Sequence, residues 1–204
     1  MAKIKQAKGK QQPKESKKAN FPNSLHLKYK KEIAPEFMKK FGYKSVMAVP
    51  KIERIVVNAG IGKWLENENM QQNVLEDLAK ITGQRPVFTL SKQAISGFKI
   101  KQNQKVGVRV TLRGRKMYDF LERLIVEGLP RVRDFQGIPT SNFGRRGNAN
   151  LGIKEHVVFA EIDSENIDYT FSFQINIVNS CKNQKEGIEL LKALGLPVRE
   201  EKKD

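Results

Sequence analysis

Two segments of this chain alternate apolar and polar residues with a period of two, and this pattern constrains the fold more than any other feature. In residues 106–113 the apolar positions are Val106, Val108, Val110 and Leu112. In residues 169–178 they are Tyr169, Phe171, Phe173, Ile175 and Ile177. Such alternation predicts strands with one buried and one exposed face, as in antiparallel sheets, whereas parallel strands are usually buried on both faces.

Amphipathic segments around these strands predict helices that cover the buried sheet face. We expect helices over residues 25–41, 67–81, 116–127 and 183–194, and further strands over residues 52–59, 86–90 and 157–162. Pro35 is expected to kink or split the first helix, and Gly128 with Pro130 to close the third. Residues 91–105 and 131–152 lack a clear period and are predicted to be long basic loops. The chain is therefore expected to form one α+β domain over residues 24–199, an antiparallel β-sheet with helices packed on one face.

The positive charge of the chain is distributed unevenly along it. The formal net charge is +16, with +8 in residues 1–32 and +10 in residues 85–146, whereas residues 147–204 carry −3. Like charges gathered in a folded region repel one another unless a polyanion neutralises them. This distribution predicts a nucleic-acid partner.

The Lys-rich segment at residues 1–23 has too few large apolar residues to build a core. We expect it to be disordered when alone, either as a solubilising tail or as a basic arm that lies along a phosphate backbone. Residues 200–204 are expected to be a frayed end.

The exposed faces of the two alternating strands carry groups that suit RNA. They are Arg109, Thr111 and Arg113 on one strand, and Thr170, Ser172, Gln174 and Asn176 on the other. Hydroxyl and amide groups both donate and accept hydrogen bonds, which fits 2′-OH groups and base edges in the wide minor groove of RNA. The alternative is an ordinary solvated sheet face. No protruding recognition helix of the kind that DNA-binding proteins use is evident, although an architectural DNA-binding protein stays a competing hypothesis.

The sequence offers no recognisable catalytic or cofactor-binding motif. Two histidines and the single Cys181 have no zinc-ligand spacing, and the complete P-loop pattern is absent. An acidic cluster at Glu161, Asp163, Glu165 and Asp168 is expected to be a solvated turn rather than a metal site. No apolar run approaches the ~20 residues of a membrane span. We therefore expect no enzyme, cofactor, metal, membrane or small-molecule substrate; RNA modification or cleavage is the competing enzymatic hypothesis.

Six short segments occur in an order that resembles a known family. They are residues 55–62 (IVVNAGIG), 81–86 (ITGQRP), 96–100 (SGFKI), 110–114 (VTLRG), 130–135 (PRVRDF) and 143–148 (FGRRGN). Together they resemble the large-subunit ribosomal protein L5 family, in its bacterial type, from about residue 25 to residue 199.

The resemblance implies a structural, non-enzymatic protein of the cytoplasmic ribosome. Its implied partners are 5S rRNA in the central protuberance, large-subunit rRNA, the P-site tRNA, neighbouring large-subunit proteins and a head protein of the small subunit. Asn58, Gln84 and Thr111 match polar positions on the 5S-facing sheet surface, and Arg109 and Arg113 flank them by the strand argument above.

The resemblance also assigns two loops. The tRNA-facing loop is implied to contain Lys92, Ser96, Gly97, Phe98, Lys99 and Lys101, and the subunit-bridge region Arg131, Arg133, Arg145 and Arg146. Leu90 and Gln93 stand where the family often has Lys or Arg, so a weaker or displaced tRNA contact is expected. Gly144, Arg145 and Ala149 also depart from the family pattern, which alters the expected bridge geometry.

Overall fold

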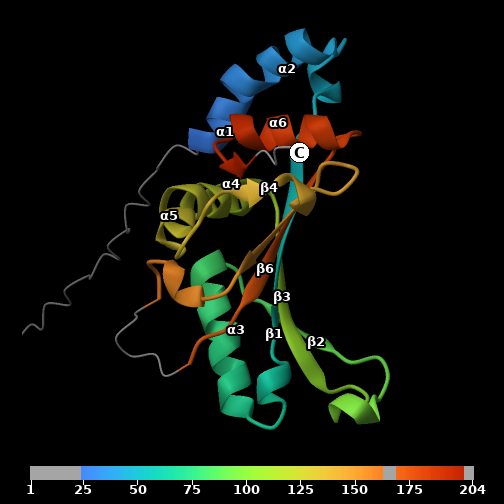
Figure 1. Ribbon diagram of the computed structural model, residues 1–204, viewed down its shortest axis with the longest axis vertical. Helices are drawn as coiled ribbons and strands as arrows, with labels where there is room; N and C mark the ends of the chain where they lie inside the picture. The colour runs from blue at the N-terminus through green and yellow to red at the C-terminus, as the bar shows by residue number, and fades with distance from the viewer. Residues whose placement is uncertain (1–23, 163–168, 200–204) are drawn as a thin grey trace, which may run out of the picture.

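An antiparallel sheet of five strands forms the centre of the molecule, in a computed structural model that describes residues 24–162 and 169–199. Its order is β2–β3–β1–β6–β5 (Figure 1). The strands are β1 (Ile52–Gly60), β2 (Val87–Leu90), β3 (Lys105–Leu112), β5 (Ala149–Ile153) and β6 (Phe173–Asn179). The short strands β4 (Ile138–Pro139) and β7 (Val198–Arg199) pair in parallel beside it.

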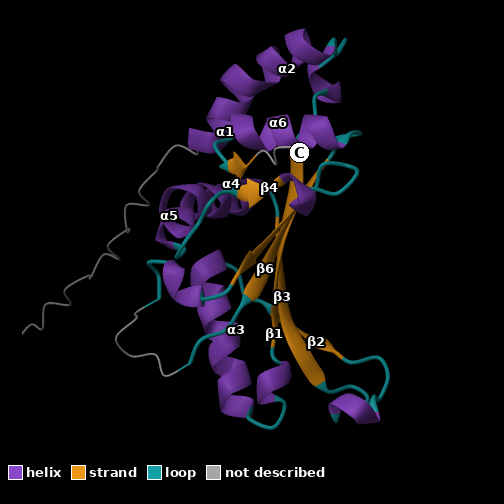
Figure 2. Cartoon of the chain, viewed as in Figure 1, coloured by secondary structure: helices purple, strands orange, loops and turns teal. Residues whose placement is uncertain are grey.

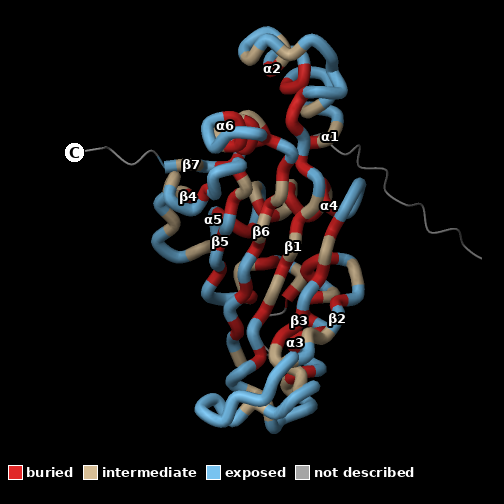
Figure 3. The backbone as a smooth tube through the Cα atoms, turned by 90° about the vertical axis from the view of Figure 1, so that its right-hand side faces the viewer, coloured by how far each residue is buried: buried red, intermediate tan, exposed pale blue. Residues whose placement is uncertain are grey.

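One face of the sheet is covered by helices α3 (Glu68–Thr82) and α4 (Gly114–Arg123), which lie on the same side of it (Figures 1 and 2). Ile55 of β1 pairs with Leu112 of β3 and Ile177 of β6, and each is no more than 1% exposed. In the next inward row, Val57 lies between Val110 and Ile175. The alternation of buried and half-buried or exposed residues along β1, β3, β5 and β6 is visible in Figure 3. The predicted α+β fold, with helices on one sheet face, is confirmed.

The remaining helices lie at one end of the sheet. They are α1 (Ser24–Lys28), the π-helical turn η1 (Tyr29–Ile33), α2 (Ala34–Phe41) and α6 (Gln184–Ala193) (Figure 1). The irregularity expected at Pro35 occurs just before it, because the Ala34 N–H bonds the Tyr29 carbonyl across a wider turn. Sequence signals also set the ends of α3: Asn67 accepts a bond from the Met70 N–H, and Gly83 adopts φ +64°.

Helix α4 continues past the predicted stop at Gly128 and Pro130. A π-helical turn η5 (Leu124–Gly128) leads directly into α5 (Leu129–Arg131). Pro130 follows within α5, and the helix ends one residue later at Arg131. The expectation that Gly128 and Pro130 close the helix was therefore wrong.

Two strand predictions were also wrong. Residues 157–162 form no strand; the segment begins with the 3₁₀ turn η7 (His156–Val158), and His156, Phe159 and Ile162 are buried at intervals of three. Strand β5 lies inside the segment predicted to be an irregular loop. Strand β6 starts at Phe173, four residues later than predicted, because Tyr169 and Phe171 stack beside His156 instead of pairing in the sheet.

Predictions for residues 1–23 and 200–204, and for Asp163, Glu165 and Asp168 of the acidic cluster, lie outside the described residues. Glu161 of that cluster is described and forms an ion pair with Arg123. Within residues 24–162 and 169–199, no helix has the length and apolar character of a membrane span.

Candidate nucleic-acid interface

The sheet face opposite α3 and α4, hereafter the open face, carries rows of polar side chains that cross several strands. Asn58 on β1 lies between Arg109 on β3 and Gln174 on β6. Directly opposed residues in antiparallel strands have Cβ atoms about 4.5–5.5 Å apart. An amide, a cation and a second amide are therefore neighbours on one row.

The next row of the open face continues toward the β5 edge. Val56 lies between Thr111 and Asn176, and Asn176 pairs in turn with Asn150 of β5. Thr111 and Asn176 are half-buried, whereas Asn150 is exposed. The two rows form a mixed surface of donors and acceptors across four strands.

Gln84 joins this surface through the backbone of β3. Its side-chain Nε2 donates to the Thr111 carbonyl at 3.1 Å, just beyond the last paired residue of β2. The structure thus places Asn58, Arg109 and Thr111 on one sheet face, and Gln84 beside Thr111 at its edge. Arg113 follows β3 at the start of α4 and is exposed, so it lies at the border of the open face.

The loop of residues 91–104, which connects β2 to β3, has a folded base. The Ser91 N–H donates to the Gln104 carbonyl at 2.9 Å, and the Lys101 N–H donates to the Gln104 side chain at 2.9 Å. An isolated bridge between Ile95 and Ile100 closes the tip around the 3₁₀ turn η4 (Ser96–Phe98). Lys99 adopts φ +54° there. These bonds fix the direction of the loop away from the sheet.

The tip of this loop presents an unusual combination of groups to solvent. Phe98 is 72% exposed, and Lys92, Ser96, Gly97, Lys99 and Lys101 are all exposed. The structure therefore groups all six predicted loop residues in one projecting element. An exposed aromatic ring among lysines suits stacking on a base or sugar next to phosphates.

The four arginines predicted for a subunit bridge lie on two separate segments. Arg131 ends α5 and Arg133 follows it, and Arg133 lines a cavity of about 490 Å³ with Lys154 and Glu155. Arg145 and Arg146 lie on a tight turn in which the Gly147 N–H bonds the Gly144 carbonyl at 2.8 Å. Arg146 lines a different cavity of about 590 Å³. No residue lines both cavities, so the structure does not combine the four arginines into one site.

Two open-face residues were missed by the sequence reasoning. Arg54 shares the face of Asn58, four residues along β1, and this parity was visible in the strand predicted over residues 52–59. Asn150 was missed because its segment was predicted to be a loop. Both extend the polar surface toward the 144–148 turn.

A buried polar cluster lies beneath the opposite sheet face. His156 is fully buried, its Nδ1 accepts a long 3.5 Å bond from the Phe171 N–H, and its ring stacks on Phe171. Its Nε2 lies 3.8 Å from an Asp77 carboxylate oxygen and has no hydrogen-bond partner among the described residues. Asp77 is held by the Tyr169 hydroxyl and by Lys80. Burial lowers the pKa of His156, and the negative charge of Asp77 opposes this effect.

This cluster predicts an acid-sensitive fold. The pKa of His156 is lowered relative to its ordinary value of 6.5, so its neutral form stabilises the fold above pH 6.5. Stability is then lost as the pH falls through 6.5 toward the folded-state pKa, by up to roughly 1.4 kcal/mol per pH unit. Urea unfolding between pH 7.5 and 5.5 measures it. His156→Phe is expected to show a smaller loss over this interval, and equal losses in the two proteins would contradict the role of His156.

Comparison with known proteins finds matches to the models of one protein family. Residues 45–101 match the model for ribosomal protein L5, and residues 105–198 match the model for the C-terminus of the same family. The chain belongs to the ribosomal protein L5 family. Together the two L5 matches include every predicted site residue.

Curated L5 relatives align along most of their own length. The large ribosomal subunit protein uL5 of Geotalea daltonii is 47% identical over 175 residues, which are 86% of this chain and 98% of that protein. The uL5 proteins of Syntrophomonas wolfei and Halothermothrix orenii are 46% and 45% identical, over 86% and 85% of this chain and 98% and 97% of theirs. L5 membership confirms the expectation of a structural ribosomal protein rather than an enzyme.

Proposed function

We propose that this chain binds 5S rRNA through the open face and helps to attach it to the central protuberance of the large ribosomal subunit. The observation that supports the proposal most strongly is the arrangement of Asn58, Arg109 and Thr111 on adjacent strands without a covering helix, with Gln84 bonded to the Thr111 carbonyl beside them. Phosphate contacts by arginines supply affinity, and the amides and hydroxyls set the register on the RNA. Large-subunit rRNA and neighbouring proteins are the further partners of this assembly on the cytoplasmic ribosome.

The 91–104 loop is proposed to contact the P-site tRNA. Its projecting tip combines the exposed ring of Phe98 with Lys92, Lys99 and Lys101. Leu90 is 54% exposed where the family often has a cation, so the contact relies on the tip rather than on the base of the loop.

Two segments are proposed to face the small-subunit head protein. One carries Arg131 and Arg133, and the other carries Arg145. These side chains are exposed. Since the two segments line separate cavities, the bridge would use two contact points rather than one continuous patch.

Shortening the 91–104 loop tests whether the tRNA contact and 5S rRNA binding use different parts of the protein. In the test variant, Gly-Ser replaces residues 93–102, so that the β2–β3 hairpin closes without the tip. The open face is unchanged, so binding to 5S rRNA in a filter assay is expected to match the wild type. Protection of the P-site tRNA elbow from hydroxyl radicals, on ribosomes that carry the variant, is expected to be lost.

Gln102→Ala, which leaves the tip intact, serves as the control and is expected to protect the tRNA normally. Loss of 5S binding on loop removal would move the RNA site from the open face to the loop. Unchanged tRNA protection would contradict the proposed tRNA contact.

A further inference from the structure

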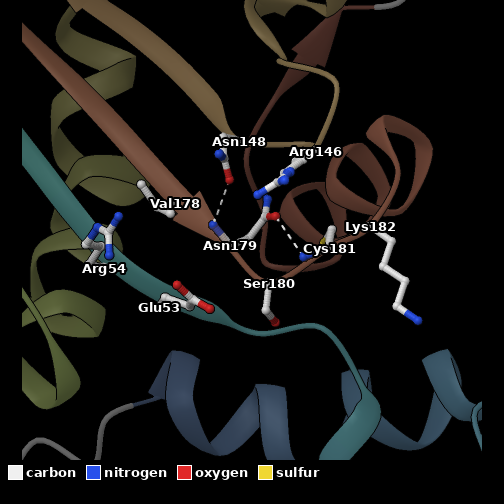
Figure 4. A pocket seen from close by; sticks show the side chains of 9 residues that line it. All are labelled: Glu53, Arg54, Arg146, Asn148, Val178, Asn179, Ser180, Cys181 and Lys182. Carbon is white, nitrogen blue, oxygen red and sulfur yellow. Dashed lines mark hydrogen bonds between the residues drawn. The ribbon is translucent and has the colours of Figure 1, made fainter.

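A cavity of about 590 Å³ lies where the open face ends, between β1, the end of β6 and the turn that precedes β5 (Figure 4). Its lining comes from three segments far apart in the sequence: Glu53, Arg54, Arg146, Asn148, Val178, Asn179, Ser180, Cys181 and Lys182. The cavity therefore exists because the fold brings these distant segments together.

The cavity has an excess of positive charge that the protein leaves unneutralised. Arg54, Arg146 and Lys182 oppose the single carboxylate of Glu53. Within the described residues, none of the three cations lies within ion-pair distance of a carboxylate. Three unpaired cations around one hollow favour an anionic ligand.

The backbone around the cavity is held rigidly by two asparagines. The buried Asn179 side chain donates to the Gly147 carbonyl at 2.6 Å, and its oxygen accepts from the Cys181 N–H at 3.0 Å. Asn148 accepts from the Asn179 N–H at 3.0 Å. These bonds, two of which are drawn in Figure 4, fix the turn that carries Arg146 relative to β6. A ligand therefore meets a preorganised backbone, which lowers the entropic cost of binding.

The position of Arg54 connects the cavity to the proposed RNA surface. Arg54 is half-buried and points to the same sheet face as Asn58, four residues away on β1. Four residues of an antiparallel strand span about 14 Å. A group bound at Arg54 is therefore distinct from any group that Asn58 contacts, although one RNA helix can reach both.

We propose that this cavity is a phosphate subsite of the RNA interface, in which Arg54 and Arg146 bind one backbone phosphate of the RNA that lies on the open face. Arginine suits the role because its planar donors match two phosphate oxygens at once. Lys182 adds a third positive charge at the rim, and Glu53 opposes binding. The inference deepens the proposed function and rests on it. It also moves Arg146 from the subunit-bridge region to the RNA interface.

Single-charge substitutions test this subsite. Arg54→Gln and Arg146→Gln are each expected to weaken 5S rRNA binding about tenfold. Each is also expected to make the slope of log K against log salt shallower by about 0.7–0.9. Glu53→Gln is expected to tighten binding, because it removes the negative charge that lines the cavity. Arg199→Gln makes the same charge change on β7, away from the cavity, and is the matched control, with no expected effect on 5S rRNA binding.

Three further measurements separate the subsite from general electrostatics and from misfolding. Phosphate ethylation interference is expected to find a phosphate whose modification weakens the wild type but not Arg54→Gln or Arg146→Gln. Arg54→Lys keeps the charge without the planar donors, and is expected to restore the salt slope but not the full affinity. At constant ionic strength, inorganic phosphate is expected to displace RNA no better than chloride does, and stronger displacement would indicate a small-anion site instead.

The outcomes distinguish failure of the proposed 5S rRNA binding from failure of the phosphate subsite alone. If the wild type binds 5S rRNA no better than a random duplex, the proposed function fails. If the wild type prefers 5S rRNA but Arg54→Gln and Arg146→Gln behave like Arg199→Gln, only the phosphate subsite is wrong.

Discussion

Replacing Gly187 by alanine is expected to destabilise the protein by about 3 kcal/mol or more. A Cβ at Gly187 of α6 would lie 2.4 Å from the Cα of Gly147 and 2.5 Å from its carbonyl oxygen. Both obstructing atoms belong to the backbone, so the 144–148 turn must separate from α6. That movement also breaks the 2.6 Å bond from Asn179 to the Gly147 carbonyl, in a buried site where a lost bond is costly.

Urea unfolding of Gly187→Ala against the wild type measures this loss, and the melting temperature is expected to fall by roughly 6–12 °C. Gly152→Ala on β5 is the matched control, because its added Cβ meets no atom within 4 Å. It is expected to stay within about 0.5 kcal/mol of the wild type. Similar stabilities for Gly187→Ala and Gly152→Ala would contradict the close approach of α6 to the turn.

Removing Arg109 and Arg113 together is expected to have the largest effect on RNA binding. Arg109 and Arg113 are exposed and have no ion-pair partner among the described residues, so both are available to phosphates. Arg109→Ala with Arg113→Ala is expected to weaken 5S rRNA binding about 100-fold. The salt slope is expected to become shallower by about 1.4–1.8.

The control for this double variant is Arg131→Ala with Arg199→Ala, which removes the same charge away from the open face. It is expected to leave the affinity and slope near those of the wild type. If the two double variants weaken binding equally, affinity depends on the total charge of the protein and not on the open face.

Alternation along single strands predicted which sheet face is buried, but not which strands are neighbours. The burial of Val108 and Ile175 was predicted, because successive side chains of a strand point to opposite faces of the sheet. The order β2–β3–β1–β6–β5 depends on pairing between distant segments, which periodicity does not specify. Alternation identified Arg109 and Thr111 as exposed, and the family resemblance added Asn58, but neither predicted the row in which Asn58 pairs with Arg109.

The errors arise where local residue preferences and tertiary packing disagree. In β5, Ala149, Leu151 and Ile153 alternate as a strand requires, but Asn150 and Gly152 have low strand preference and masked the pattern. The apolar segment after His156 resembled a strand, yet its buried residues recur every three positions, as a 3₁₀ turn requires.

The cavity between Arg54 and Arg146 could not be predicted from the sequence. These residues are 92 positions apart, and they meet only because β1 pairs with β6 and the 144–148 turn packs on α6. Motif resemblance placed Arg145 and Arg146 in one functional group with Arg131. The structure separates them because the two segments lie at different cavities.

The most direct test of the central claim is a salt titration of wild-type binding to 5S rRNA, to a random RNA duplex of equal length and to a DNA duplex. In the proposed function, specificity comes from the polar rows around Asn58 and Thr111, and the arginines supply the electrostatic part that all three nucleic acids share. The expected result is tighter binding to 5S rRNA at every salt concentration, with steep salt dependence for all three. Equal affinity for 5S rRNA and the random duplex, or preference for DNA, would contradict the open face as a specific 5S rRNA interface.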